Sequence, residues 1–140
     1  MPEQLTSTEL GRAAEKAVAV YFTSRGYTLL SRNYTVGHLG ELDLVLSHDA
    51  ERQSTAPDQL LHSTPVLTIV EVKARRDSMR YGGAAAALTP AKLRRIRQTT
   101  LHFQQKHHFM NNQVELLAAL VHLNEQGTVR NIEIIPIEWQ

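Results

Sequence analysis

The chain has 140 residues, of which 42% are hydrophobic and 21% charged, and its formal net charge at pH 7 is +1. This length and composition are typical of one globular domain, residues 1–140, and no run approaches the roughly 18 apolar residues of a membrane span. The chain has no cysteine, which excludes disulfides and thiolate zinc sites. The opening Met-Pro-Glu-Gln-Leu-Thr lacks the apolar core of a secretory signal, and we expect a cytoplasmic protein.

Charge is distributed unevenly along the chain. Between Lys73 and His108 there are nine Lys or Arg residues and one acidic residue, Asp77. The rest of the chain carries six basic and thirteen acidic residues. A concentrated basic segment suits a polyphosphate partner such as nucleic acid, but a solvated helix face has the same composition. Charge alone leaves both interpretations open.

The first predicted element is a helix from near Thr6 to Gly26. Thr6 and Glu9 have the spacing of a capping box. Glu15 lies close to the apolar face of this helix, from which a carboxylate can reach a site or remain at the edge of the solvated face. The residues predicted on the core face are Leu10, Ala14, Ala17 and Tyr21.

Two strands are predicted next, over 27–34 and 41–47, and Gly37 between them favours a hairpin. Residues 48–63 are mostly polar and have no clear period, so we expect a flexible connector within the domain. A third strand is predicted over 66–73, where the apolar run is again of strand length.

The second half of the chain predicts one more helix and two more strands. The Gly82-Gly83 pair allows a sharp backbone turn, and Thr89-Pro90 is a strong helix start. The resulting order αβββαββ, with a closing antiparallel hairpin over 114–123 and 129–139, predicts an α/β fold in which helices flank a mixed central sheet. In the second helix the predicted core residues are Leu93, Ile96, Thr100 and Phe103, and the predicted basic stripe is Lys92, Arg95, Thr99, His102 and Lys106.

Ionisable residues interrupt two of the apolar strands. Because side chains alternate along a strand, Glu71 and Lys73 point the same way, as do Glu41 and Asp43. A charge buried among Val, Ile and Leu is costly unless it is paired or holds a metal. The pattern therefore favours a metal site, and the alternative is an ordinary ion pair at a strand end.

An acidic residue followed, after a gap, by Glu-X-Lys on a core strand is the layout of the PD-(D/E)XK nucleases. Hydrolysis of a phosphodiester needs a metal held by oxygens, an activated water and positive charge for the transition state. Asp43, Glu71 and the backbone carbonyl of Val72 are the candidate ligands of Mg²⁺ or Mn²⁺, with Glu41 ranked behind Asp43. Lys73 is the candidate for orienting or deprotonating the water.

Several short motifs, taken together, resemble the YraN family. The motifs are Gly11-x-x-Ala14-Glu15, Arg32-Asn33, Gly40-Glu41-Leu42-Asp43-Leu44, Val70-Glu71-Val72-Lys73-Ala74-Arg75, Tyr81-Gly82 and Lys92-x-x-Arg95. That family is similar to archaeal Holliday junction resolvases. The resemblance implies a restriction-endonuclease-like fold, a nucleic-acid partner and a role for Glu15 as a further catalytic and metal-binding carboxylate. The chain departs from the family pattern at Ala14, where a glycine is usual, and at Gln113-Val114-Glu115, which lacks an arginine.

We expect a divalent-metal-dependent endonuclease that acts on DNA, including branched or otherwise structured DNA. The predicted DNA-binding residues are Arg75, Arg76, Arg80, Lys92 and Arg95. One alternative is a nucleic-acid-binding module that keeps the nuclease fold without cleaving, and another is a protein-interaction domain with a structural ion pair. An enzyme that makes paired cuts is expected to be a symmetric homodimer, for which the apolar closing hairpin is the candidate interface.

Overall fold

The computed structural model of the protein describes residues 5–49, 65–76 and 88–138. The elements follow the predicted αβββαββ order, and the strands form one mixed sheet in which neighbours along the chain are neighbours in space. Of the four strand pairs, β3 with β4 is parallel and the others are antiparallel. The elements are α1 (Ser7–Thr23), β1 (Thr28–Val36), β2 (Gly40–His48), β3 (Val66–Arg76), α2 (Pro90–His107), β4 (Val114–Leu123) and β5 (Val129–Ile137).

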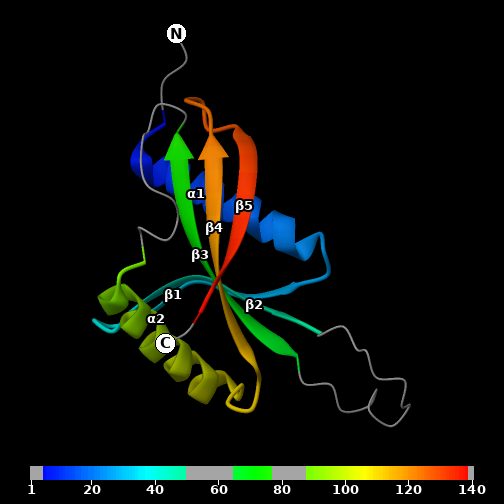
Figure 1. Ribbon diagram of the computed structural model, residues 1–140, viewed down its shortest axis with the longest axis vertical. Coiled ribbons are helices and arrows are strands. Elements are labelled where there is room, and N and C mark those ends of the chain that lie inside the picture. Colours follow the sequence, from blue (N-terminus) through cyan, green and yellow to red (C-terminus); the bar gives the residue numbers. More distant parts are fainter. Residues whose placement is uncertain (1–4, 50–64, 77–87, 139–140) are drawn as a thin grey trace.

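The two helices lie on opposite faces of the sheet (Figure 1). Helix α1 crosses behind β3, β4 and β5, whereas α2 lies beside β1 and β2, which cross the lower part of the other strands at a steep angle (Figure 1). This mixed sheet with flanking helices is the predicted α/β class and is compatible with a restriction-endonuclease-like fold. Neither described helix is long and apolar enough to span a membrane.

Some predicted features lie outside the described residues. They include the connector over 48–63 apart from its first two residues, and also Arg80, Tyr81, the Gly82-Gly83 pair and Trp139.

Helix α1 begins at the predicted capping box. Thr6 Oγ1 accepts a hydrogen bond from the Glu9 backbone N–H, and Glu9 Oε1 accepts one from the Thr6 backbone N–H, both at 3.1 Å. The helix ends at Thr23, before the predicted Gly26, whose φ of +93° allows the chain to turn towards β1.

The buried stripe of α1 differs slightly from the predicted one. Leu10 and Ala14 are buried as predicted, and the stripe continues through Val18, Ala19 and Phe22. Ala17 and Tyr21, which were predicted on the core face, are only half-buried at its edge. The difference arises because the buried residues repeat every four positions, so the stripe drifts around the helix.

Strand β3 is buried on both faces and separates two apolar clusters. Val70 packs with residues of α1, whereas Leu67 and Ile69 pack with Ile96 and Phe103 of α2. This alternation explains the continuous apolar run of β3, since a strand covered on both sides has no solvent face.

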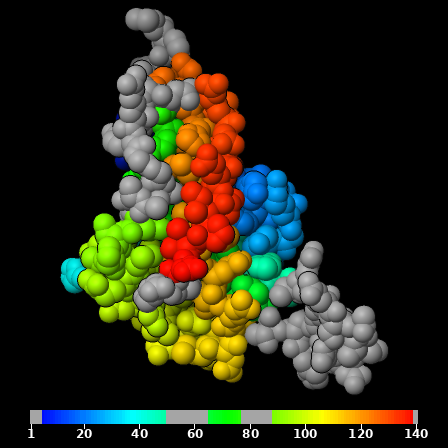
Figure 2. Space-filling model, viewed as in Figure 1, coloured from blue at the N-terminus to red at the C-terminus, as the bar shows by residue number. Residues whose placement is uncertain are grey.

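Strand β5 forms an edge of the sheet. Its side chains are half-buried or exposed along its length, and it runs along the molecular surface beside β4 (Figure 2). The predicted closing hairpin of β4 and β5 is confirmed, with Leu120 opposite Glu133 in an antiparallel register.

Helix α2 begins at the predicted Thr89-Pro90 pair. Thr89 Oγ1 accepts a hydrogen bond from the Lys92 backbone N–H at 3.1 Å, and Pro90 is the first helical residue. His108 closes the helix in the left-handed conformation, with φ +62°.

The predicted basic stripe of α2 is wrong at Thr99, which is fully buried and donates a hydrogen bond to the Arg95 carbonyl at 2.7 Å. His102 is also half-buried, and its Nδ1 lies 2.7 Å from the Tyr34 hydroxyl oxygen. Both residues lie on the side of α2 that packs on the hairpin of β1 and β2, so the buried face of the helix is wider than predicted. Ile96, Thr100 and Phe103 are buried as predicted, and Leu93 is half-buried against the same cluster.

The close approach of α2 to β2 occurs at Gly40. A Cβ atom at this position would lie 2.9 Å from Thr99 Oγ1 and 3.4 Å from Arg95 Cβ, and the φ of Gly40 is +153°. Both the backbone conformation and the space therefore favour glycine. This contact fixes the helix against the strand that carries Asp43.

Gly40→Ala is expected to lower the free energy of unfolding by roughly 1–3 kcal/mol, because the added methyl group pushes α2 away from β2. Gly11→Ala in α1 is the control, since a Cβ there meets nothing within 4 Å. It is expected to raise stability by about 0.5–1 kcal/mol through helix propensity. Urea denaturation of both variants measures the difference, and equal stability of the two would contradict this account of the helix contact.

Candidate functional site

The candidate site lies where β2 and β3 separate. Their backbone pairing ends at Leu44 and Val70, although β3 continues beside β4 for six more residues. Immediately beyond this point, Asp43 Oδ2 accepts a hydrogen bond from the Val72 backbone N–H at 2.8 Å. A carboxylate thus replaces the backbone acceptor of a neighbouring strand, and Asp43 is held beside β3.

Glu71 places a second carboxyl group against that of Asp43. Glu71 is 7% exposed, and its carboxyl group interacts with that of Asp43. Burial and then the neighbouring Asp43 charge raise the pKa of Glu71 to about 8. Burial likewise raises the pKa of Asp43. The pair therefore retains a proton near neutral pH when no cation is bound.

One oxygen of this pair is unsatisfied. Glu71 Oε1 is buried and has no hydrogen-bond partner in the described part of the chain. A buried acceptor without a partner costs free energy, so such an atom calls for a ligand or a functional explanation.

Two lysines influence the carboxyl pair, and the one on α2 has the larger effect. Lys92 lowers the pKa of both Asp43 and Glu71, and for Asp43 its effect exceeds that of Lys73. Lys92 is half-buried, whereas the Lys73 side chain is exposed on β3. Lys92 was predicted to bind DNA and Lys73 to take part in catalysis. Of the two, Lys92 has the stronger electrostatic effect on the carboxyl pair.

Glu15 reaches the edge of this site from α1. Burial and then the charge of Asp43 raise the pKa of the half-buried Glu15. Oriented with its nitrogen towards the two carboxylates, the Asn33 amide donates to Glu41 Oε1 at 2.9 Å and to Glu15 Oε1 at 3.3 Å. Asn33 therefore links Glu15 and Glu41 beside Asp43.

Sequence reasoning assigned no role to Asn33. Its φ is +50°, a left-handed conformation that asparagine tolerates better than most residues. Pairing of Arg32 with Leu44 and of Tyr34 with Leu42 places Asn33 across from Asp43. The available signal was an asparagine inside an otherwise β-prone segment, where its low strand propensity requires a reason.

The predicted DNA-binding residues occupy different environments. Arg95 is exposed on α2, and Arg75 and Arg76 are half-buried on β3. Arg76 Nη2 donates a hydrogen bond to the Leu5 carbonyl, so this guanidinium contacts the segment before α1. The structure thus brings Asp43 and Glu71 together, and Asn33 links Glu15 to Glu41 beside them. Lys92 acts on the pair through its charge, and Arg95 lies one turn of helix beyond Lys92.

The carboxyl pair fits a hard divalent cation. Within residues 5–49, 65–76 and 88–138, no three Asp, Glu or His side chains gather into a metal site. Mg²⁺, however, is commonly held by one or two carboxylates, with waters and substrate phosphates completing its coordination. Asp43 and Glu71 supply such oxygens, and the orphaned Glu71 Oε1 supplies an acceptor that a cation would satisfy.

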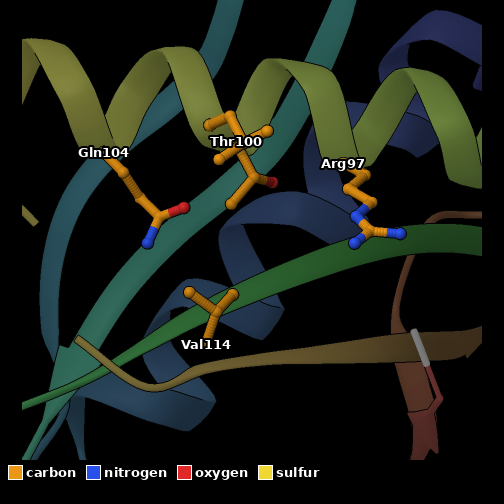
Figure 3. Close-up of a pocket in the computed structure, with 5 residues that line it drawn as sticks. Arg97, Thr100, Gln104 and Val114 are labelled. Carbon is orange, nitrogen blue, oxygen red and sulfur yellow. The ribbon is translucent and has the colours of Figure 1, made fainter. Parts of the chain in front are cut away.

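Two cavities of the described surface lie away from the carboxyl pair. A cavity of about 180 Å³ between α2 and the start of β4 is lined by Arg97, Thr100, Leu101, Gln104 and Val114 (Figure 3). A larger one, of about 610 Å³, lies beside His48 and Glu115, whose side chains are 3.0 Å apart. Neither of these two cavities is lined by Asp43 or Glu71.

Glu71→Gln is expected to remove a pH dependence of stability. The folded pKa of Glu71, about 8, lies above its ordinary value of 4.5. The folded state therefore binds the proton more tightly, and wild-type stability falls as pH rises from about 5 to about 8. Since one pKa unit corresponds to about 1.4 kcal/mol, the loss is on the order of a few kcal/mol.

Urea denaturation of wild type and Glu71→Gln at a series of pH values tests this expectation. The variant should show a flatter profile and exceed wild type in stability above pH 8, because glutamine stays neutral. Asp49→Asn, which alters an exposed carboxylate, should keep the wild-type profile. Parallel profiles for wild type and Glu71→Gln would contradict the raised pKa.

Comparison with known proteins identifies relatives over most of the chain. The sequence profile of uncharacterised protein family UPF0102 matches residues 14–129. A UPF0102 protein of Renibacterium salmoninarum is 34% identical over 128 residues, covering 91% of this chain and 93% of its own. Relatives in Methylococcus capsulatus and Neisseria gonorrhoeae are 37% and 30% identical, covering 69% and 81% of this chain and 65% and 84% of their own. The resemblance to the YraN family is thereby confirmed, and the chain belongs to uncharacterised protein family UPF0102.

Proposed function

We propose that this protein is a divalent-metal-dependent endonuclease that hydrolyses phosphodiesters of DNA in the cytoplasm. The observation that carries the proposal is the carboxyl pair of half-buried Asp43 and buried Glu71, with its unsatisfied oxygen. A carboxyl pair with only a structural role would destabilise an apolar sheet, because burying its charge costs free energy. In a cation-binding pair the same negative charge binds the metal.

Asp43 and Glu71, with the Val72 backbone carbonyl, would hold Mg²⁺ or Mn²⁺. When bound, the cation supplies Lewis-acid polarisation of the phosphodiester and lowers the pKa of a water. The Val72 N–H fixes Asp43, which orients its free oxygen for binding. Lys73 is exposed two residues beyond Glu71, where its ammonium is available to an approaching phosphate or water.

Helix α2 supports the choice of a nucleic acid as substrate. No acidic residue occurs within it, and Arg94, Arg95 and Arg97 are exposed in its first half. These guanidinium groups follow Lys92, whose charge acts on the carboxyl pair. A duplex phosphate backbone bound along this end of α2 would therefore pass close to the candidate cation site.

Cleavage of labelled single-stranded, duplex, flap and four-way-junction DNA with Mg²⁺ or Mn²⁺ tests the activity. Wild type is expected to cut at least one substrate in a metal-dependent manner. Asp43→Asn and Glu71→Gln are expected to lose roughly 100-fold or more in rate, the scale of one catalytic electrostatic contact.

Glu133→Gln is the matched control for this assay, because Glu133 is an exposed carboxylate on β5. It should cleave at the wild-type rate. Cleavage that persists in Asp43→Asn, or that requires no metal, would contradict the proposed site.

Arg95→Gln is expected to weaken DNA binding at all sequences and to lower the slope of log affinity against log salt by about 0.9, the value for one phosphate contact. Arg12→Gln serves as control because this exposed arginine lies on α1, on the opposite side of the sheet. Fluorescence anisotropy at several salt concentrations measures both slopes. An equal loss in the two variants would indicate a general charge effect without a contact at Arg95.

A second candidate function is nucleic-acid binding without cleavage. The observation that favours it is that Glu15 is linked to Asn33 and Glu41, and that three carboxylates do not converge on one metal position among the described residues. The cleavage assay separates the candidates, since intact DNA binding without cutting on any substrate would support the binding module.

A further inference from the structure

A second group of polar side chains lies where β2 ends and β3 and β4 begin. Glu115 Oε1 accepts a hydrogen bond from Thr68 Oγ1 at 2.7 Å and lies 3.0 Å from His48 Nε2. Thr68 is fully buried and lies opposite Glu115 in the parallel register of β3 and β4. The other ring nitrogen of His48 lies 3.3 Å from the Asp49 carbonyl oxygen. The carboxylate and the imidazole are therefore both held in place by contacts within the sheet.

This group borders the cavity of about 610 Å³, to which Arg25 and Tyr27 contribute from the turn between α1 and β1. Small-molecule sites typically have volumes of about 300–1,000 Å³. His48 follows Asp43 by five residues on β2, which at about 3.3 Å per residue corresponds to a separation of roughly 16 Å. The cavity is thus distinct from the carboxyl pair.

Two charged side chains of the cavity have atoms left for a ligand. Among the described residues, Glu115 Oε2 accepts no hydrogen bond, although Oε1 has two polar neighbours. Arg25 Nη1 donates to the Tyr21 carbonyl at 2.8 Å, and the guanidinium carbon lies 3.6 Å from the centre of the Tyr21 ring. Its Nε and Nη2 make no hydrogen bond within the described part of the chain. The cavity therefore presents a fixed acceptor for N–H groups and a fixed donor for an anion.

Aromatic rings line the same cavity. The centroid of the Tyr27 ring lies 4.4 Å from that of the His48 ring, and the two planes are tilted by 42°. Phe22, which is buried in the cluster beneath α1, packs edge-on against Tyr27 with 4.8 Å between centroids. Nucleobases stack on aromatic and histidine side chains, and a carboxylate accepts hydrogen bonds from their amino groups.

We propose that this cavity binds a nucleoside monophosphate whose base carries an amino group. The base stacks beside Tyr27 and His48 and donates its amino hydrogens to Glu115, and the phosphate binds Arg25. Asp49, an exposed carboxylate that also lines the cavity, disfavours an anion that brings no N–H donor. The inference goes beyond the proposed cleavage of DNA and does not depend on it, because the cavity is distinct from the carboxyl pair.

Calorimetric titration with CMP and UMP tests the base contact, since the two differ in an amino group at one position of the base. Wild type is expected to bind CMP about tenfold more tightly than UMP, the scale of one base-edge contact. Glu115→Gln should lose this preference. Glu133→Gln is the matched control and should keep it, because Glu133 also faces a histidine, His122 at 3.8 Å, but does not line the cavity.

Replacing CMP with cytidine tests the phosphate contact. Wild type is expected to bind CMP about tenfold more tightly than cytidine, as for a hydrogen bond to a charged group. Arg25→Gln should bind the two equally, and its exposed position makes a folding defect a poor explanation of that result. Arg12→Gln, which alters another exposed arginine of the α1 region, should keep the wild-type ratio.

A short oligocytidine separates a free nucleotide from a nucleotide within a strand. Tighter binding of the oligocytidine than of CMP, lost in Glu115→Gln, would assign the cavity to a strand, whereas equal or weaker binding would assign it to the free nucleotide. Equal affinity of wild type for CMP and UMP would overturn the proposal. It would also be overturned if wild type bound no CMP and Glu115→Gln left binding of the oligocytidine unchanged, or if neither bound.

Discussion

A carboxylate that completes a β ladder is the interaction on which the site depends. Where β2 leaves β3, the Val72 N–H bonds to Asp43 Oδ2 in place of a backbone carbonyl. The backbone group is thereby satisfied, and the carboxyl group is held at the point where the sheet opens. Glu71 precedes Val72 on β3, so both carboxyl groups lie at the point where the two strands separate.

Helix α2 depends on the same opening. Its close contact with Gly40 is possible because that residue has no side chain, and this contact holds α2 against the strand that carries Asp43. In this packing arrangement the carboxyl groups of β2 and β3 lie together, and the charge of Lys92 on α2 acts on both. The raised pKa of Glu71 follows from it, since burial and the proximity of Asp43 both disfavour its charged form.

Features that depend on a few neighbouring residues could be predicted from the sequence. Features that depend on how helices and strands pack against one another could not. The capping box at Thr6 and the helix start at Thr89-Pro90 operate within one helical turn, and both are present. Asp43 and Glu71 could be singled out because they are charges inside apolar strands. Which residues of α2 are buried depends on how closely the helix packs on Gly40. The sequence therefore did not predict that Thr99 is buried or that the charge of Lys92 acts on the carboxyl pair. The role of Asn33 depends on strand register and a left-handed backbone.

The spacing of the site residues along the chain has a consequence for folding. Glu15, Asp43, Glu71 and Lys92 come from α1, β2, β3 and α2, and at least twenty residues separate each from the next. No local segment contains enough of the site to assemble it, and the parallel pairing of β3 with β4 closes a long loop around α2. The environment of the carboxyl pair therefore forms only when β2, β3 and both helices have packed together. In an unfolded chain the same carboxylates are separated and hydrated, so the raised pKa of Glu71 is a property of the folded state alone.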